Sequence, residues 1–315
     1  MPRLHIEIEG IVQGVGFRPF VFQLARKLGL AGWVLNDSRG VKIAAEGEDD
    51  ALERFCTALR SEHPPLARIS RFETVEISPT GEHGFAIRES EVLASRSAQI
   101  APDAATCPDC LRELDDPDDR RYRYPFINCT NCGPRYTIVT GVPYDRPLTT
   151  MASFAMCPKC RAEYEDPASR RFHAQPNACP VCGPQLRLCD AQGRSMAGEA
   201  LAETVRLLQE GRIVAIKGLG GYHLAVDAAN SDAVAELRRR KMRDEKPFAL
   251  MAFDLSRIRR FAEANEAEQR LLTGIERPIV LLRRRTESVI SDLVAPGNRY
   301  FGVMLPYTPL HHLLL

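Results

Sequence analysis

Eight of the ten cysteines of this 315-residue chain fall into Cys-x2-Cys pairs, a spacing at which thiolates bind metal ions. The pairs form two sets with the same Cys-x2-Cys-x18-Cys-x2-Cys spacing, and the second set repeats the first at an offset of fifty residues. Four thiolates complete the tetrahedral coordination of a structural zinc ion. We therefore predict two structural zinc ions, bound by Cys107, Cys110, Cys129, Cys132 and by Cys157, Cys160, Cys179, Cys182.

Redox dithiols and disulfides are the alternative interpretation of these cysteines. The first residues, MPRLHIEIEG, lack the apolar stretch of a signal peptide, and no run approaches the ~20 apolar residues of a spanning helix. We therefore predict a cytoplasmic protein with no membrane partner. Disulfides are disfavoured in that compartment, which favours metal binding. The spacing leaves open whether the pairs combine within each repeat or across the two repeats.

A second candidate site lies in the segment GIVQGVGFR, residues 10–18, which joins a predicted strand to a predicted helix. Two glycines allow backbone N–H groups to turn inward, and the N-terminus of the helix adds its dipole. The segment is neither a Walker A loop nor a dinucleotide fingerprint. We predict that this loop binds a phosphate through Gln13, Gly14, Val15, Gly16 and Phe17.

Two further side chains would complete a catalytic site at this loop. Arg18 follows the loop directly and would supply a fixed positive charge to a phosphoryl group. Asn36 ends the second predicted strand, where its amide could orient an attacking water. The alternative interpretation makes the loop an ordinary turn and Asn36 a turn residue beside Asp37.

The elements around this loop follow a β-α-β-β-α-β order. Alternating apolar residues predict a strand at residues 4–8, and a helix follows over residues 19–28. Strands are predicted at 33–36, 41–45, 69–77 and 85–87, with a second helix over 49–59. This order predicts a ferredoxin-like sandwich over residues 1–91.

Three further regions follow. Residues 92–106 are predicted as a linker, and residues 107–190 contain the duplicated cysteine unit. From residue 198 to the last residue, 315, an α/β pattern returns, with strands predicted at 213–217, 248–252 and 279–282 and a helix over 232–240. The predicted fold class is therefore α+β and multidomain.

Charge argues against a general nucleic-acid surface, because 42 basic and 41 acidic residues give a net charge of +1. The segment RRYRYPF, residues 120–126, interleaves arginines with aromatic rings, as in single-strand binding surfaces. Four aspartates just before it, at 115, 116, 118 and 119, would cancel its field. We expect a salt-bridged surface there and no nucleic-acid partner.

Basic residues also gather in the last region, where Lys241, Arg243 and Lys246 lie between a predicted helix and strand. Cations at the end of a helix can bind a triphosphate, although a basic run is also typical of a solvated helix face. Lys217, at the end of a strand before a Gly-Leu-Gly-Gly turn, is a further candidate for nucleotide binding.

The motifs resemble one known family in this order along the chain. GIVQGVGFRPF with GWVLNDSRG resembles the acylphosphatase signature, and the doubled cysteine unit with PYDRPLTTM resembles the HypF family of hydrogenase maturation carbamoyltransferases. KGLGGYHLAVDA and RRRKMRDEKPFALM resemble the YrdC-type nucleotide domain of the same family. The resemblance covers nearly the whole chain.

The resemblance implies a reaction cycle. Arg18 would bind the phosphoryl group of carbamoyl phosphate, and Asn36 would position the water that hydrolyses it. Lys241 and Arg243 match a Lys-x-Arg motif that in this family binds ATP, with its Mg²⁺ ion, and a carbamate species. Carbamoyl adenylate would form there, and the carbamoyl group would pass to the C-terminal cysteine of the partner HypE.

Two features of the family are not found in this sequence, a Ser-x-Asn motif of the YrdC-like domain and an actin-like ATPase domain. The resemblance therefore predicts that the chain is the N-terminal portion of a longer protein, with an incomplete YrdC-like domain. Two alternatives remain: a stand-alone acylphosphatase with an accessory zinc module, and a zinc-dependent RNA-binding protein of the YrdC type.

Overall fold

The computed structural model describes residues 1–91 and 98–315 and contains two compact units. The first unit comprises Met1–Ala104 with Ile127–Gly183, and the second comprises Ala105–Phe126 with Pro184–Leu315. Within the described residues, every helix is too short or too polar to cross a bilayer.

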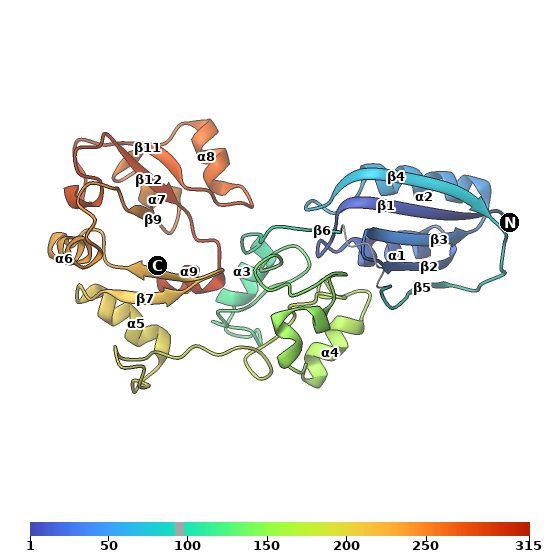
Figure 1. Cartoon of the computed structure of the whole chain (residues 1–315), viewed down its shortest axis with the longest axis horizontal. Helices are drawn as coiled ribbons and strands as arrows, with labels where there is room; N and C mark the ends of the chain where they lie inside the picture. Colours follow the sequence, from blue (N-terminus) through green and yellow to red (C-terminus); the bar gives the residue numbers. More distant parts are fainter. Residues whose placement is uncertain (92–97) are drawn as a thin grey trace. The chain divides into compact units, whose positions relative to one another are not determined.

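A six-stranded sheet forms the N-terminal part of the first unit (Figure 1). Its order is β4-β1-β3-β2-β5, with β6 paired to β1, and the neighbours β4-β1, β1-β3 and β3-β2 are antiparallel. The strands are β1 (Arg3–Gln13), β2 (Ala31–Asn36), β3 (Gly40–Glu46), β4 (Arg68–Ile77), β5 (Phe85–Ile87) and β6 (Gln99–Ile100). This order is that of a ferredoxin-like sandwich, which confirms the predicted fold of this region.

Two helices cover one face of this sheet, α1 (Phe17–Lys27) and α2 (Asp49–Ser61) (Figure 1). The core between the layers follows from the alternation of β1, whose Ile6 and Ile8 are buried on the face toward the helices. Phe55 of α2 is fully buried in the same core. The sheet and α1 together hold the loop 14–16 at the edge of this core.

The predicted linker lies partly in the sheet. Residues 92–97 are outside the described residues, but Gln99 and Ile100 pair in parallel with Ile11 and Gln13 of β1. This strand has two residues, too few for alternation to reveal it in the sequence.

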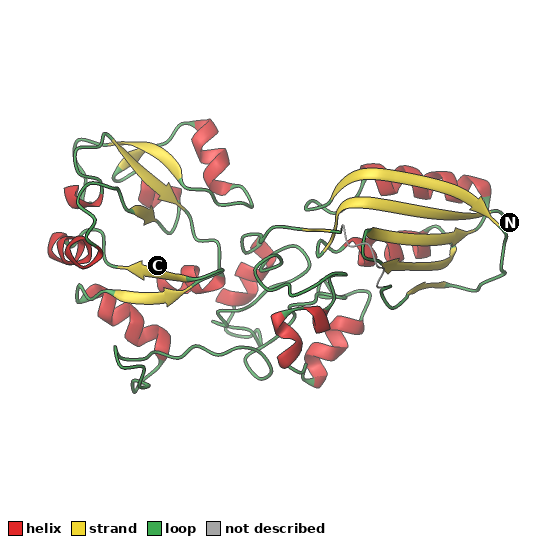
Figure 2. Cartoon of the chain, in the orientation of Figure 1, coloured by secondary structure: helices red, strands yellow, loops and turns green. Residues whose placement is uncertain are grey.

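The rest of the first unit, residues 127–183, is built mostly from loops (Figure 2). Its regular elements are the helix α4 (Pro158–Glu165) and the short 3-10 turns η1 (Arg146–Leu148) and η2 (Thr150–Ser153). Arg146 connects these loops, because its guanidinium donates to the carbonyls of Gln175, Asn177 and Phe154. In this region, hydrogen bonds from side chains to backbone carbonyls connect neighbouring segments, as backbone hydrogen bonds between strands do in the sheet.

The second unit contains the predicted α/β region. A four-stranded sheet of order β10-β11-β12-β9 and a two-stranded sheet β7-β8 carry its strands, and Leu282, Phe301 and Val303 are fully buried in its core. The strands are β7 (Val214–Lys217), β8 (Tyr222–Ala225), β9 (Ala249–Met251), β10 (Ala262–Glu263), β11 (Val280–Arg284) and β12 (Tyr300–Met304). The helices are α3 (Pro108–Asp115), α5 (Ala200–Gln209), α6 (Ser231–Lys241), α7 (Leu255–Ile258), α8 (Glu266–Thr273) and α9 (Pro309–Leu314), with the 3-10 turn η3 (Asp292–Val294).

Candidate functional site

The loop between β1 and α1 has the backbone that phosphate binding requires. Gly14 and Gly16 have φ angles of 75° and 76°, in the left-handed region that side chains disfavour. Gly16 is also the N-cap of α1, whose first turn has no acidic residue. The N–H groups at the start of this eleven-residue helix, with its dipole, therefore favour an anion at the loop.

These two glycines also allow a second layer of the unit to contact the loop. A Cβ atom on Gly14 would lie 3.1 Å from Arg135 Cδ and 3.3 Å from Tyr144 Cε1. A Cβ atom on Gly16 would lie 3.2 Å from Thr130 Cβ. A larger residue at either position would thus meet neighbours as well as backbone strain.

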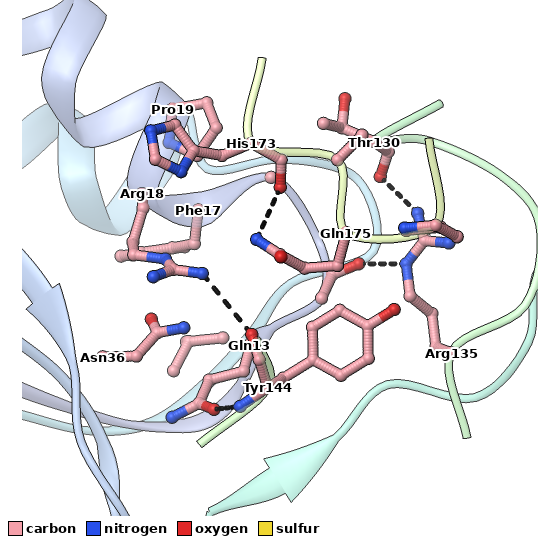
Figure 3. A pocket seen from close by; sticks show the side chains of 15 residues that line it. Gln13, Phe17, Arg18, Pro19, Asn36, Thr130, Arg135, Tyr144, His173 and Gln175 are labelled. Atoms are coloured by element: carbon pink, nitrogen blue, oxygen red, sulfur yellow. Dashed lines mark hydrogen bonds between the residues drawn. The ribbon is translucent and has the colours of Figure 1, made fainter. Parts of the chain in front are cut away.

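Arg18 is buried beside this loop and fixed by several partners (Figure 3). Its Nη2 donates to Asp145 Oδ1 at 2.7 Å and to the Tyr144 carbonyl at 3.4 Å. Its Nη1 makes one long contact among the described residues, to Ser90 Oγ at 3.3 Å. The charge is therefore held in one place, with Nη1 the most available donor for a phosphoryl oxygen.

Asn36 lies next to Arg18. It is 1% exposed, and its hydrogen-bonding environment turns the amide oxygen toward Arg18, where it accepts from Nε and Nη2 at 3.1 Å each. The turn role belongs instead to Asp37, whose Oδ1 accepts from the N–H groups of Arg39 and Gly40 at 2.8 Å. Asn36 keeps its amide N–H2 for another group.

Of the predicted loop residues, three can contribute only through their backbone. The Gln13 amide is fully used, because Nε2 donates to the carbonyls of Asp37 and Gly40 and Oε1 accepts from Tyr144 N. Val15 and Phe17 are at most 1% exposed in the core. The predicted phosphate contacts therefore reduce to backbone N–H groups and Arg18.

A pocket opens at this site, and residues 127–183 form its other wall (Figure 3). The space open to the centre of a water-sized molecule is about 20 Å³. From the loop side it is lined by residues that include Gly14, Gly16, Arg18 and Asn36. The residues from the other wall are Thr130, Arg135, Tyr144, His173, Ala174, Gln175 and Pro176.

Arg135 joins the phosphate loop to the second cysteine pair. It is 1% exposed, and its guanidinium donates to the Gly14 carbonyl and to the carbonyls of Cys129, Cys132 and Thr130. Arg135 is not among the predicted site residues, although it directly follows the Cys-Gly-Pro of the first repeat. Because this buried arginine bonds to both segments, it fixes the position of the phosphate loop relative to the cysteine pair.

His173 lines the pocket close to Arg18. Burial, with the positive charge of Arg18, lowers its pKa to about 4, so the imidazole is neutral at pH 7. Its neighbour Gln175 donates from Nε2 to the His173 carbonyl and accepts from Arg146 N and Tyr164 Oη. Neither position carries a sequence signal of its own, because both lie in loops.

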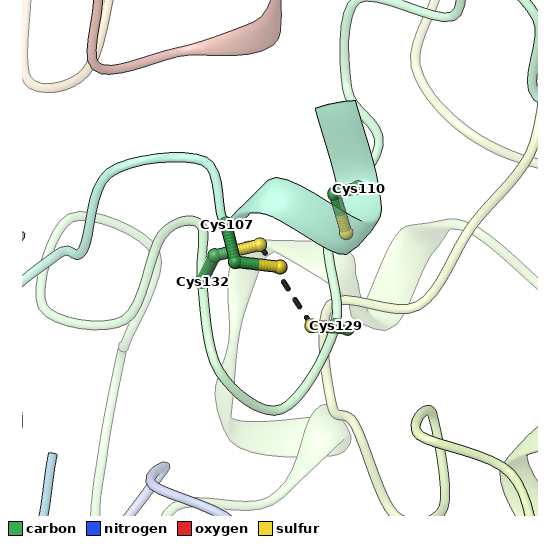
Figure 4. A group of neighbouring side chains, drawn as sticks. All are labelled: Cys107, Cys110, Cys129 and Cys132. Atoms are coloured by element: carbon green, nitrogen blue, oxygen red, sulfur yellow. Dashed lines mark hydrogen bonds between the residues drawn. The ribbon is translucent and has the colours of Figure 1, made fainter. Parts of the chain in front are cut away.

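The eight cysteines form two groups, one from each repeat, so the pairs combine within repeats and not across them. Figure 4 shows the group of the first repeat. In each group the four sulfur atoms lie within 4.8 Å of one another, and none of these eight described cysteines is in a disulfide. A tetrahedral zinc with Zn–S bonds of about 2.3 Å needs sulfurs about 3.8 Å apart. The Cys129–Cys132 and Cys157–Cys179 separations are 3.8 Å, and that of Cys179–Cys182 is 3.7 Å.

The electrostatics of the second group also suit a metal. Burial raises the pKa of Cys157, but hydrogen bonds from the Cys160 backbone and from neighbouring thiols outweigh it and lower the pKa to about 6. Thiolates are the form that binds metal. The four-sulfur sets therefore fit zinc, and they leave no coordination position for a substrate.

The predicted nucleotide residues lie on the second unit at two places. Lys217 ends β7 and is exposed, with Nζ 5.6 Å from the Tyr222 ring centre. Lys241 ends α6 and is exposed, as is Lys246 in the turn that follows. Arg243 donates to the carbonyls of Lys246 and Pro247, so its guanidinium shapes this turn.

Arg238, which is not among the predicted nucleotide residues, organises the same turn. It is 8% exposed, and it donates to the carbonyls of Arg243, Asp244 and Lys246. Arg238 lies on the same buried face of α6 as Val234 and Leu237. Helix periodicity in the sequence therefore can indicate that this arginine is buried, one turn before the basic cluster.

Family models match three parts of the chain: acylphosphatase over residues 4–87, HypF finger over residues 106–139 and 156–189, and a Sua5/YciO/YrdC model described as telomere recombination over residues 206–315. Carbamoyltransferase HypF2 of Cupriavidus necator is 56% identical over 99% of this chain and 39% of its own length. An acylphosphatase of Thermotoga maritima is 43% identical over 28% of this chain and 98% of its own length.

Solved structures show the same relationship. A crystal structure titled full-length HypF in the phosphate- and nucleotide-bound form has a TM-score of 0.95 and 46% identity, covering 99% of this chain and 41% of that one. HypF of T. kodakarensis has a TM-score of 0.91 and 50% identity, covering 100% of this chain and 40% of that one. The chain thus spans about two fifths of the length of these relatives.

Proposed function

Over the part of those proteins that it spans, the chain belongs to the HypF family of carbamoyltransferases, and on that premise we propose that it hydrolyses carbamoyl phosphate at the Arg18 site. The observation that carries the proposal is the meeting of the glycine loop, Arg18 and Asn36 in one pocket. In the proposed cycle carbamate then reaches the YrdC-like region, where ATP with Mg²⁺ converts it to carbamoyl adenylate and pyrophosphate. The carbamoyl group finally passes to the C-terminal cysteine of HypE, during hydrogenase maturation.

Each residue of the pocket has a role in the first step. The loop N–H groups and the Arg18 Nη1 donor bind the phosphoryl oxygens, which neutralises their charge as water attacks phosphorus. The Asn36 amide N–H2, not engaged by Arg18, holds the attacking water. An acyl phosphate is already activated, so positioning and charge supply most of the rate enhancement.

Asp145 has the role of a positioning residue. Its carboxylate lies 2.7 Å from Arg18 Nη2 and keeps the guanidinium next to Asn36. A carboxylate at this distance also offsets part of the Arg18 charge, which limits the affinity for the product phosphate. Turnover benefits, because a product that binds too tightly leaves slowly.

The two zinc ions are proposed to be structural. In the second repeat Asn177 Nδ2 donates to the Cys160 carbonyl, and Asn177 follows the pocket residues 173–176 directly. A zinc ion there would fix the pocket wall without taking part in the chemistry. Structural zinc contributes on the order of 10 kcal/mol to folding in small domains, which suits a region made of loops.

ATP is proposed to bind the second unit through Lys217, Lys241, Arg243 and Lys246. The support is the basic turn after α6 and a relative of known structure described as nucleotide-bound. A fluorescent ATP analogue with Mg²⁺ tests the assignment: Lys241→Ala should weaken binding about tenfold, and the exposed Arg260→Ala should not. A cytoplasmic location is part of the same proposal.

Hydrolysis of carbamoyl phosphate and of acetyl phosphate, with inorganic phosphate as competitor, tests the proposed function. Arg18→Ala should raise KM and lower kcat, because the charge contacts both substrate and transition state. Asn36→Ala should lower kcat about 100-fold and leave phosphate inhibition nearly unchanged, because an oriented water matters only as the new bond forms. Arg26→Ala, at an exposed position of the same helix, is the matched control. Unchanged hydrolysis in both Arg18 and Asn36 variants would contradict the proposal.

A further inference from the structure

Tyr144 is attached to the phosphate loop at both ends of its backbone. Its N–H donates to Gln13 Oε1 at 2.8 Å, and its carbonyl accepts from Arg18 Nη2 at 3.4 Å. Its ring packs on the loop, since a Cβ atom on Gly14 would lie 3.3 Å from Cε1. The side chain is therefore placed by the same residues that place the phosphate site.

The hydroxyl of Tyr144 is buried without a hydrogen-bond partner among the described residues. The side chain is 1% exposed, and an unpaired buried hydroxyl costs about 1–3 kcal/mol. Phenylalanine would avoid this cost in the same space. A buried polar group that the protein leaves unpaired calls for a partner outside the protein, a bound water or a ligand.

Tyr144 lines the pocket, and its hydroxyl lies on the side away from Arg18 (Figure 3). Figure 3 shows the ring reaching toward Arg135, with its hydroxyl on that side and Arg18 and Asn36 on the other. A substrate whose phosphoryl group contacts Arg18 would extend its acyl group away from Arg18. In this orientation the acyl group would lie on the Tyr144 side of the pocket (Figure 3).

The other polar side chains on that side are already in use. The Arg135 guanidinium donates to the carbonyls of Gly14, Cys129, Cys132 and Thr130. The Gln175 amide has partners on both its nitrogen and its oxygen, and Thr130 Oγ1 donates to the Arg170 carbonyl. Among these residues, the Tyr144 hydroxyl is the donor left for a ligand.

We propose that Tyr144 is a catalytic residue whose hydroxyl donates a hydrogen bond to the carboxyl oxygen of the leaving group of a small acyl phosphate. The inference rests on the proposed hydrolysis at the Arg18 site. Water forms the new O–P bond while the bond between phosphorus and the acyl oxygen breaks, and its electron pair stays on the leaving carboxylate. The products are RCOO⁻ and H₂PO₄⁻, the phosphate keeping both protons of the water, so atoms and charge balance.

The hydrogen bond becomes stronger as this reaction proceeds. Negative charge grows on both oxygens of the departing carboxylate, so a fixed donor stabilises the transition state more than the substrate. Burial raises the pKa of Tyr144, which keeps the hydroxyl protonated near neutral pH. The pocket is small, with about 20 Å³ open to the centre of a water-sized molecule, which disfavours any acyl group larger than carbamoyl or acetyl.

The test compares Tyr144→Phe with Tyr136→Phe, a tyrosine that is 69% exposed in the same unit. Tyr144→Phe should lower kcat for carbamoyl phosphate and acetyl phosphate about 10- to 100-fold. The inhibition constant of inorganic phosphate should stay the same, because phosphate has no acyl oxygen. The melting temperature should be unchanged or higher, since an unpaired buried group is removed.

Three results would overturn the assignment in distinguishable ways. Equal kcat in Tyr144→Phe and wild type would mean that the hydroxyl holds only a buried water. A matching loss of phosphate affinity and turnover would mean that the side chain acts by packing against Gly14. A wild-type chain without acyl phosphate hydrolysis would remove the proposed function as well.

Discussion

The two four-cysteine repeats have the same backbone but expose different side chains to the rest of the protein. Their helices, α3 (Pro108–Asp115) and α4 (Pro158–Glu165), each start one residue after a cysteine and lie fifty residues apart. Arg123 and His173, also fifty apart, both have a φ angle of 52°. The same backbone bond holds each, from Arg123 N to Leu114 O and from His173 N to Tyr164 O.

The side chains that line the phosphate pocket come from different positions of the two repeats. The first repeat contributes Thr130 in its second cysteine pair, and Arg135 just after it. The second repeat contributes His173 and Gln175, which lie before its second pair. The corresponding residues in the other copy are Pro180, Gln185, Arg123 and Pro125, and they have different chemistry.

Packing against α1 differs in the same way. Phe172 of the second repeat is 5% exposed and lies 5.5 Å from the Phe22 ring of α1, whereas its counterpart Tyr122 is 43% exposed. Gln23 of α1 also donates to the Pro167 carbonyl. When metal coordination fixes the backbone of a repeat, the surface side chains of that repeat can differ without loss of its fold. Each repeat can therefore contribute different residues to the phosphate pocket.

The largest effect that would test this comparison is loss of one metal. Cys110→Ser and Cys160→Ser each remove a fully buried thiolate from one group, so each should lower the zinc content from two ions to one. The loss should destabilise that repeat by on the order of 10 kcal/mol. Cys160→Ser should also abolish acyl phosphate hydrolysis, because the second repeat carries His173 and Gln175, whereas Cys110→Ser should retain part of it.

Metal analysis and urea unfolding measure these effects, with Cys56→Ser as the control because Cys56 lies outside both groups. Folded wild-type protein with no bound zinc would refute the metal assignment. Equal loss of hydrolysis in both group variants would remove the distinction between the repeats.

A smaller effect is expected from exchanging residues between equivalent positions. Arg135→Gln places the residue of the second repeat in the first and leaves buried carbonyls without donors, so it should destabilise the first unit by about 3–5 kcal/mol. The reciprocal Gln185→Arg changes an exposed residue and should alter stability by less than about 0.5 kcal/mol. Chemical denaturation of both variants measures the asymmetry, and similar values would contradict it.

The smallest effect concerns pH. His173 has a folded pKa of about 4, below the value near 6.5 of an unfolded histidine, so the unfolded chain binds more protons between these values. Stability from this group is fully present above pH 6.5 and is lost as the pH falls toward 4. His173→Asn should therefore lose about 2 kcal/mol less stability than wild type between pH 7 and pH 5. If the unfolding free energies of wild type and His173→Asn, measured in urea, changed in parallel with pH, His173 would not titrate in this way.

The ferredoxin-like part was predictable because its signals are local. Buried Ile6 and Ile8 alternate in β1, and the glycines that turn the chain into α1 are adjacent in sequence. Arg18 and Asn36 were selected from local signals too, Arg18 from its position just before a predicted helix and Asn36 from the end of a predicted strand. The strand β8 was missed because three of its four residues are exposed, so it has no apolar alternation.

The far wall of the pocket was not predictable from local patterns. Arg135 and Tyr144 lie in irregular loops, and each reaches the phosphate loop across more than 120 positions of sequence. What brings them there is a network of side-chain bonds to carbonyls, which has no periodicity. In the sequence, the cysteine spacing is the signal that indicates ordered loops in this region.

Hydrolysis of carbamoyl phosphate in ¹⁸O-labelled water tests the central claim most directly, that the loop, Arg18 and Asn36 place a water on phosphorus. The label should appear once in each phosphate released by the enzyme, read from the ³¹P shift and corrected for spontaneous breakdown. Asn36→Ala should release labelled phosphate at a rate about 100-fold lower. Unlabelled phosphate from the enzymatic reaction would place the attack on the acyl carbon and contradict the account.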